Sequence, residues 1–128
     1  MNSLFPDICT DHLARSRDFY RDLLGFEVVF ENSWYVQMHH PKQPAAQIAF
    51  VQRDHDSVPK PYGTRPQGVL VTVELDDVDA CHAHAQALGI EPVYALVSEV
   101  WGQRHFMVED PNGLLVDVVQ LIPPPGGA

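Results

Sequence analysis

The hydrophobic and polar positions follow the same order twice along the chain. Two stretches, residues 11–24 and 77–88, carry apolar side chains at helical spacing. Each ends at a glycine, Gly25 or Gly89, a residue that readily takes the left-handed conformation that closes a helix. Short apolar runs predict four strands around each helix: residues 3–10, 26–31, 34–39 and 47–52 in the first half, and residues 69–75, 91–97, 103–109 and 115–121 in the second.

Direct matches between the halves support an internal repeat. The segment LLGFEVVF, residues 23–30, matches ALGIEPVY 64 positions later. The segment HHPKQPAAQIAF aligns without a gap on EDPNGLLVDVVQ at an offset of 70. The repeat predicts an α+β protein of two tandem βαβββ modules, with helices outside a curved, cup-like mixed β-sheet. We expect modules at 1–52 and 68–121, a proline- and charge-rich linker at 53–67, and a loose tail at 122–128.

Composition and charge narrow the classes of partner. The formal net charge of the 128 residues is -9, and no basic stripe runs along the chain. Nucleic acid and anionic membrane surfaces are therefore not expected partners. No apolar run approaches the roughly 20 residues that span a bilayer, and the first residues lack the features of a signal peptide. The two cysteines have neither metal-site nor disulfide-framework spacing, which favours a cytoplasmic location.

The repeated order, together with two motifs, resembles a known family. A duplicated βαβββ unit with SRDFYRDLLGFE after the first strand and VEDPNGLLVDVVQ at the end is similar to the vicinal oxygen chelate superfamily. This group contains glyoxalase I, extradiol dioxygenases, fosfomycin-modifying enzymes and bleomycin-binding resistance proteins. The resemblance implies that each module forms half of a cup, and that chains of this length pair as homodimers. It does not specify a reaction, because one scaffold carries many functions.

The resemblance also implies where a metal would bind. Metal-dependent members place histidines early in the first strand of each unit and carboxylates in the last strand. The repeat puts Leu4 and Leu70 at the histidine positions, and Gln47 and Asp117 at the carboxylate positions. Leucine has no donor atom, and one carboxylate with one amide is too few ligands for a divalent metal. The sequence therefore predicts no metal site of the usual kind and no cofactor.

Strand alternation predicts which other residues share a face with Asp117. In the second half these are His105 and Met107, and the repeat adds positions in the first half, with Leu4 and Leu70 at the floor. Asp117 has two interpretations, a ligand-directed carboxylate or a structural hydrogen-bond acceptor. His105 is likewise either a site residue or a satisfied structural histidine. The predicted ligand-binding residues are Tyr35, Gln37, Gln47, His105, Met107 and Asp117.

Two function classes fit these residues. The favoured hypothesis is a metal-independent protein of the glyoxalase/bleomycin-resistance type that holds a small molecule in the cup, a mixed apolar and polar surface typical of ligand sites. The alternative is a lyase, isomerase or dioxygenase of the same superfamily. It would use Asp117 and His105 as acid and base, or as relocated metal ligands together with Gln47.

Overall fold

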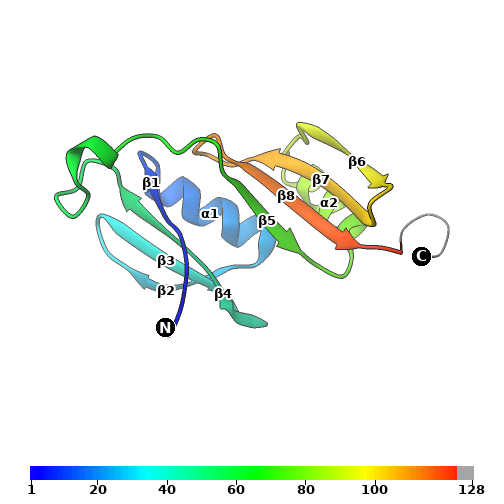
Figure 1. Ribbon diagram of the computed structural model, residues 1–128, viewed down its shortest axis with the longest axis horizontal. Helices are drawn as coiled ribbons and strands as arrows, with labels where there is room; N and C mark the ends of the chain where they lie inside the picture. Colours follow the sequence, from blue (N-terminus) through cyan, green and yellow to red (C-terminus); the bar gives the residue numbers. More distant parts are fainter. Residues whose placement is uncertain (124–128) are drawn as a thin grey trace. The chain divides into compact units, whose positions relative to one another are not determined.

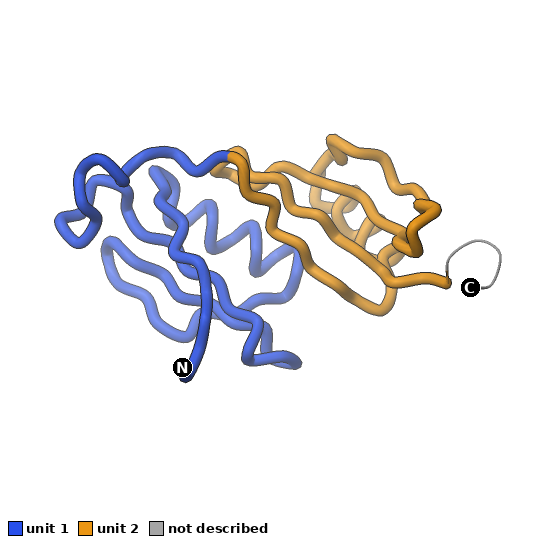
Figure 2. Tube along the Cα trace, viewed as in Figure 1, with its two compact units in different colours: residues 1–67 blue, residues 68–128 orange. Residues whose placement is uncertain are grey.

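The computed structural model describes residues 1–123 and divides the chain into two compact units, residues 1–67 and residues from Gly68 onward (Figures 1 and 2). Most of the predicted tail, residues 124–128, lies outside the described residues. Each unit has the order strand, helix, three strands. The first contains β1 (Asp7–Thr10), α1 (Leu13–Leu24), β2 (Glu27–Glu31), β3 (Tyr35–His40), β4 (Gln43–Gln52) and the short 3-10 helix η1 (Lys60–Tyr62). The second contains β5 (Leu70–Glu74), α2 (Val78–Ala87), β6 (Tyr94–Glu99), β7 (Gln103–Glu109) and β8 (Leu115–Leu121).

Each unit is built on one four-stranded mixed sheet. The strand order is β1-β4-β3-β2 in the first unit and β5-β8-β7-β6 in the second. The first strand of each unit pairs parallel to its last strand, and the other neighbours are antiparallel. The predicted α+β fold of two βαβββ modules is confirmed. Within the described residues, no helix is long and apolar enough to cross a membrane.

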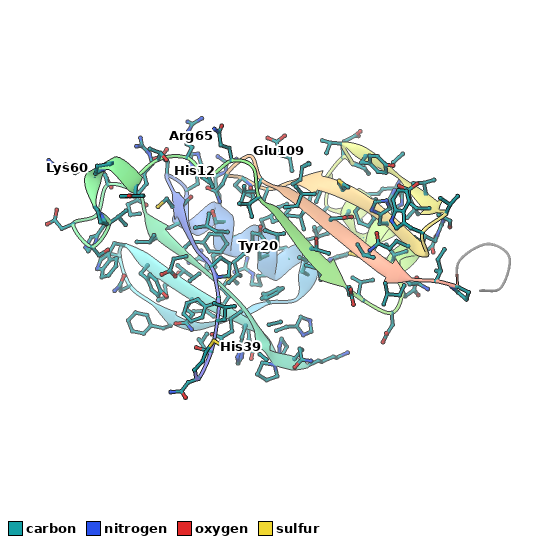
Figure 3. All side chains as sticks on the ribbon, in the orientation of Figure 1. His12, Tyr20, His39, Lys60, Arg65 and Glu109 are labelled. Carbon is teal, nitrogen blue, oxygen red and sulfur yellow. The ribbon has the colours of Figure 1, made fainter. Side chains whose placement is uncertain are left out.

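One face of each sheet packs against the helix of its unit. In the first unit, Tyr20 of α1 is fully buried and its ring lies 5.3 Å from the ring of Phe50 on β4 (Figure 3). In the second, His82 of α2 meets the edge of the buried Phe106 ring at 5.1 Å. Four residues of β3 and β7 lie on these helix faces and are buried: Val36, Met38, Phe106 and Val108. Burial of these apolar side chains against the helix therefore determines which side chains of the same strands point away from it.

We call the sheet face opposite the helix the open face of each unit. The β3–β4 register places Tyr35 and Gln37 on the open face of the first unit with Gln47. The β7–β8 register places His105 and Met107 on the open face of the second unit with Asp117. Alternation predicts this parity because successive side chains of a strand point to opposite faces.

The start of the first strand differs from the prediction. The strand begins at Asp7 rather than at residue 3, and Leu4, expected at the floor, precedes it and is 81% exposed. Pro6 gives the physical reason: it has no N–H to donate to the ladder, although its carbonyl accepts from the amide of Ala49. Leu70 begins β5 on the open face, and half of its surface is exposed.

The second helix begins at a side-chain cap. The side chain of Asp77 accepts from the amide of Ala80 at 3.0 Å. Asp79 binds Arg104 of β7 at 2.8 Å. The amide of Val78, the first residue of the helix, donates to the side chain of Gln120 on β8. Two side chains therefore accept from two of the free amides at the helix N-terminus.

Residues 53–67, predicted as a linker, fold back on the first unit. Arg53 donates to Asp11 at 2.7 Å and to the carbonyl of Gly63 at 3.3 Å. The ring of His55 stacks on Trp34 with 3.7 Å between centroids and 5° between planes. These contacts place Trp34 beside this segment, away from the sheet core.

Candidate functional site

A buried histidine lies between two carboxylates on the open face of the second unit. His105 Nδ1 is 2.7 Å from Asp117 Oδ1, and His105 Nε2 is 2.9 Å from Glu99 Oε2. The side chain of His105 is 4% exposed, and those of Asp117 and Glu99 are 13% and 14% exposed. We refer to Glu99, His105 and Asp117 as the carboxylate–histidine cluster. It gives the buried Asp117 the partner that a carboxylate needs away from water.

The three strands β6, β7 and β8 hold the cluster together. Met107 is directly opposite Asp117 and Val119 is directly opposite His105, so His105 and Asp117 are diagonal neighbours across the β7–β8 pair. Side chains at diagonal positions of an antiparallel pair come within reach of each other when they are long or aromatic. Glu99 reaches His105 from the last position of β6.

Glu99 and its neighbour Tyr94 were absent from the predicted site. The hydroxyl of Tyr94 donates to Glu99 Oε2 at 2.7 Å. The two residues are five apart, so simple alternation assigns them to opposite faces. A register shift between Tyr94 and Val97 inserts an irregularity into β6 and brings both onto the open face. No pattern of apolar residues in the sequence indicates this bulge.

The cluster favours the imidazolium form of His105. Both ring nitrogens face carboxylate oxygens, and a histidine can donate from both nitrogens only when protonated. Burial lowers the pKa of His105, but hydrogen bonds to Glu99 and Asp117 outweigh burial and raise it above its ordinary value. Hydrogen bonds from His105 and Tyr94 lower the pKa of Glu99. The geometry therefore places a protonated imidazole between two carboxyl groups.

We predict that this pairing makes stability depend on pH. Because folding raises the pKa of His105, its contribution is fully present below its unfolded pKa of about 6.5 and is lost as pH rises through the higher folded pKa. Urea unfolding between pH 6 and 9 should therefore show a steeper loss of unfolding free energy in the wild type than in His105→Gln, which cannot ionise. Parallel curves for the two proteins would contradict this assignment.

Exposed apolar and aromatic side chains border the cluster. The indole of Trp101 is 61% exposed, donates its N–H to Gln103 at 2.8 Å, and meets the His105 ring edge-on at 6.4 Å. The ring of Tyr94 lies 5.2 Å from His105. Further exposed apolar residues on the same face are Leu70, Val97 and Leu121. Convergent polar groups with an apolar border are the composition of small-molecule sites.

The open face of the first unit carries an amide–amide pair and a phenol–carboxylate pair. Gln37 donates to Gln47 at 2.7 Å, and the hydroxyl of Tyr35 donates to Asp7 at 3.3 Å. Further along the sheet, His39 lies 2.9 Å from Glu27 and is more exposed than His105 (His39 is labelled in Figure 3). Thus the predicted residues Tyr35, Gln37 and Gln47 gather in the first unit, and His105, Met107 and Asp117 in the second.

The donor atoms at the family's metal positions do not fit a divalent metal. Leu4 and Leu70 have no ligand atoms, and Gln47 and Asp117 are engaged by Gln37 and His105. The relocated set fits no better, because both nitrogens of His105 face carboxylates and the ring has no lone pair left for a metal ion. Within residues 1–123, no group of three or more His, Cys, Asp or Glu side chains has an arrangement suited to a metal ion.

Comparison with known proteins agrees with the fold. The family model described as Glyoxalase/Bleomycin resistance protein/Dioxygenase superfamily matches residues 4–118. The chain belongs to this superfamily. A bleomycin resistance protein of Geobacillus stearothermophilus is 27% identical to this superfamily member, over 91% of the chain and 95% of the relative.

Two solved structures show that the shared fold accommodates different activities. A bleomycin resistance determinant encoded on the transposon Tn5 superposes with a TM-score of 0.69 at 18% identity, covering 94% of this chain and 98% of that one. A lactoylglutathione lyase from Agrobacterium tumefaciens superposes with a TM-score of 0.73 at 23% identity, covering 94% of each chain. Superfamily membership therefore indicates the fold, and a choice between binding and catalysis has to be argued from the residues of the open face.

Proposed function

We propose that this superfamily member binds a small organic molecule on the open face of its second unit without a metal ion. The observation that supports this most directly is the buried carboxylate–histidine cluster beside the exposed Trp101 and Tyr94. The similarity to bleomycin resistance proteins along nearly the whole chain is consistent with a binding role. Pairing of two chains into a homodimer remains a prediction from the family resemblance.

The geometry favours binding over acid–base catalysis by Asp117 and His105. A general base needs a free lone pair within reach of the proton it removes. His105 is almost fully buried, and both of its nitrogens are held by carboxylates. Proton exchange with a ligand would first require breaking one of these bonds. The cluster is therefore better suited to present fixed charge and acceptor oxygens than to transfer protons.

A ligand screen with a local reporter tests the binding proposal. The chain has two tryptophans, so Trp34→Phe leaves Trp101 as the only indole. A library of metabolites and antibiotics is screened for compounds that raise the melting temperature of the protein. We expect such a compound to change the fluorescence of Trp101 as well. Trp101→Ala should weaken binding of that compound by about tenfold or more, since exposed aromatic anchors dominate small interfaces. Its melting temperature should stay near that of the wild type because Trp101 is largely exposed.

The matched control is Leu88→Ala, which truncates an exposed apolar residue at the end of α2, on the helix side of the sheet. It should leave binding unchanged. A chelator added to the titration should also leave affinity unchanged. Loss of binding with chelator would contradict metal independence, and equal losses in the Leu88 and Trp101 variants would contradict the assignment of the open face.

A further inference from the structure

The indole of Trp101 is held at its polar edge although most of its surface is exposed. Its Nε1–H donates to Gln103 Oε1 at 2.8 Å, and the rest of the side chain is accessible to solvent. The other tryptophan, Trp34, is held differently, by stacking of its ring on His55. An exposed side chain without such contacts changes rotamer freely. Trp101 is therefore an exposed aromatic residue whose orientation is restricted before any ligand binds.

The backbone around Trp101 is also fixed. Trp101 lies in the turn between β6 and β7, where the amide of Gly102 donates to the carbonyl of Glu99 at 3.1 Å. The carbonyl of Gly102 accepts from the amide of Ile122 at 2.9 Å, which ties the turn to the end of β8. Gly102 is buried and has a φ of 95°, a conformation that glycine adopts without strain. The turn thus gives the Trp101 side chain a fixed base.

Gln103 is a well-fixed acceptor because it belongs to a strand that is paired on both sides. It lies opposite Glu99 of β6 and opposite Leu121 of β8. Alternation along β7 places its side chain on the open face with that of His105. An indole N–H can only donate, so the amide of Gln103 has to present its oxygen to Trp101. The hydrogen bond consequently sets the orientation of the amide as well as that of the ring.

The hydrogen bond between Trp101 and Gln103 has little to contribute to the stability of the fold. Trp101 is largely exposed and Gln103 is half-buried, and a hydrogen bond that replaces bonds to water has a small net free energy. The restricted ring lies beside the carboxylate–histidine cluster, with 6.4 Å between the ring centroids of Trp101 and His105. A ligand that packs on a ring already held in place loses less side-chain entropy than one that packs on a mobile ring. The hydrogen bond therefore has more to contribute to binding than to folding.

We propose that Gln103 is a positioning residue, which holds the Trp101 indole in the orientation in which it contacts a bound ligand. The inference rests on the proposed binding function and adds a residue that acts on the ligand through another side chain. Gln103 does not itself have to contact the ligand. Removal of its amide should release the indole and weaken binding, while the apolar surface of Trp101 stays in place.

The mobility of the indole is measured first, on protein without ligand. In Trp34→Phe protein, Trp101 is the only indole, so its fluorescence anisotropy decay and the hydrogen exchange of its N–H can be followed alone. Gln103→Met keeps the length of the side chain and removes the strong acceptor. We expect this change to raise the amplitude of the fast anisotropy decay about twofold and to speed exchange of the indole N–H. Gln86→Met, the same change at an exposed position of α2, should leave both unchanged.

Binding is then measured with N-phenyl-1-naphthylamine, an uncharged aromatic probe whose fluorescence rises in apolar surroundings. We expect Gln103→Met to weaken its affinity about threefold, the effect of having to order one free side chain. Gln86→Met should bind the probe as tightly as the wild type. In Trp101→Phe, whose ring has no N–H, the further change Gln103→Met should leave the affinity unaltered. This non-additivity separates positioning through Trp101 from direct contact between Gln103 and the probe.

Three results would overturn the inference: an indole that is equally mobile with and without Gln103→Met, equal probe affinity of the wild type and Gln103→Met, or a threefold loss when Gln103→Met is added to Trp101→Phe. Failure of the wild type to bind N-phenyl-1-naphthylamine would overturn it as well. The proposed binding function is judged separately. It stands if a library compound that raises the melting temperature also changes the fluorescence of Trp101 in Trp34→Phe protein, whatever the outcome for Gln103.

Discussion

Replacing His105 with alanine should destabilise the protein by about 3 kcal/mol, because it leaves two carboxylates close together with no positive partner. The imidazole is almost fully buried and makes both of its hydrogen bonds to charged acceptors. Alanine also leaves a space where the ring packed beside Tyr94 and Trp101. Urea denaturation near pH 7 measures the loss, and acidification should recover part of it as the carboxylates take up protons.

The control for this variant is His39→Ala in the first unit. His39 pairs with one carboxylate, Glu27, and the two side chains are 22% and 57% exposed. An exposed pair of this kind contributes about 1 kcal/mol or less. If the two variants lost similar free energies of unfolding, the second carboxylate and the burial of His105 would add no stability. His105 would then contribute no more than an exposed ion pair.

Replacing Phe106 with alanine should destabilise the protein by about 4 kcal/mol, the usual cost of removing a large buried aromatic side chain. Phe106 is fully buried on the helix face of β7, and the ring of His82 packs against its edge. The truncation removes apolar contacts between sheet and helix and leaves a cavity that a sheet backbone cannot collapse to fill. Thermal and urea unfolding followed by circular dichroism measure the effect.

Met107→Ala is the matched control, since Met107 is the next residue of the same strand and lies on the open face, partly exposed. It should cost about 1 kcal/mol, because less apolar surface returns to water. A loss as large as that of Phe106→Ala would indicate that both faces of β7 are packed equally. That result would contradict an open face in the second unit.

The last hairpin of the second unit could be predicted because its signal is local and strictly periodic, whereas β4 of the first unit begins at Gln43, four residues before the predicted start. The predicted strands 103–109 and 115–121 have the same bounds as β7 and β8. Their alternation placed His105, Met107 and Asp117 on one face, and the register agrees. Burial on the helix face fixes that parity, since a slip by one residue would turn every apolar side chain of the strand to the wrong side.

Glu99 and Tyr94 could not be predicted, because a bulge breaks the alternation on which such predictions depend. The irregularity between Tyr94 and Val97 changes which side chains of β6 reach the open face. The predicted strand also ended at residue 97, two residues before Glu99. The first strand was predicted from residue 3 and included Leu4. It begins instead at Asp7, because Pro6 cannot donate a backbone hydrogen bond to the sheet.

The sequence by itself determined the duplicated βαβββ order, the helix-facing core and the absence of histidine at Leu4 and Leu70, since apolar periodicity and residue type are properties of the chain alone. Only the tertiary structure determined which side chain pairs with the Asp117 carboxylate. Its partner His105 is twelve residues away, and the second carboxylate on that histidine comes from a third strand. Such a cluster forms where backbone pairing brings separate strands together, and the geometry of that pairing has no signature in the local order of residues.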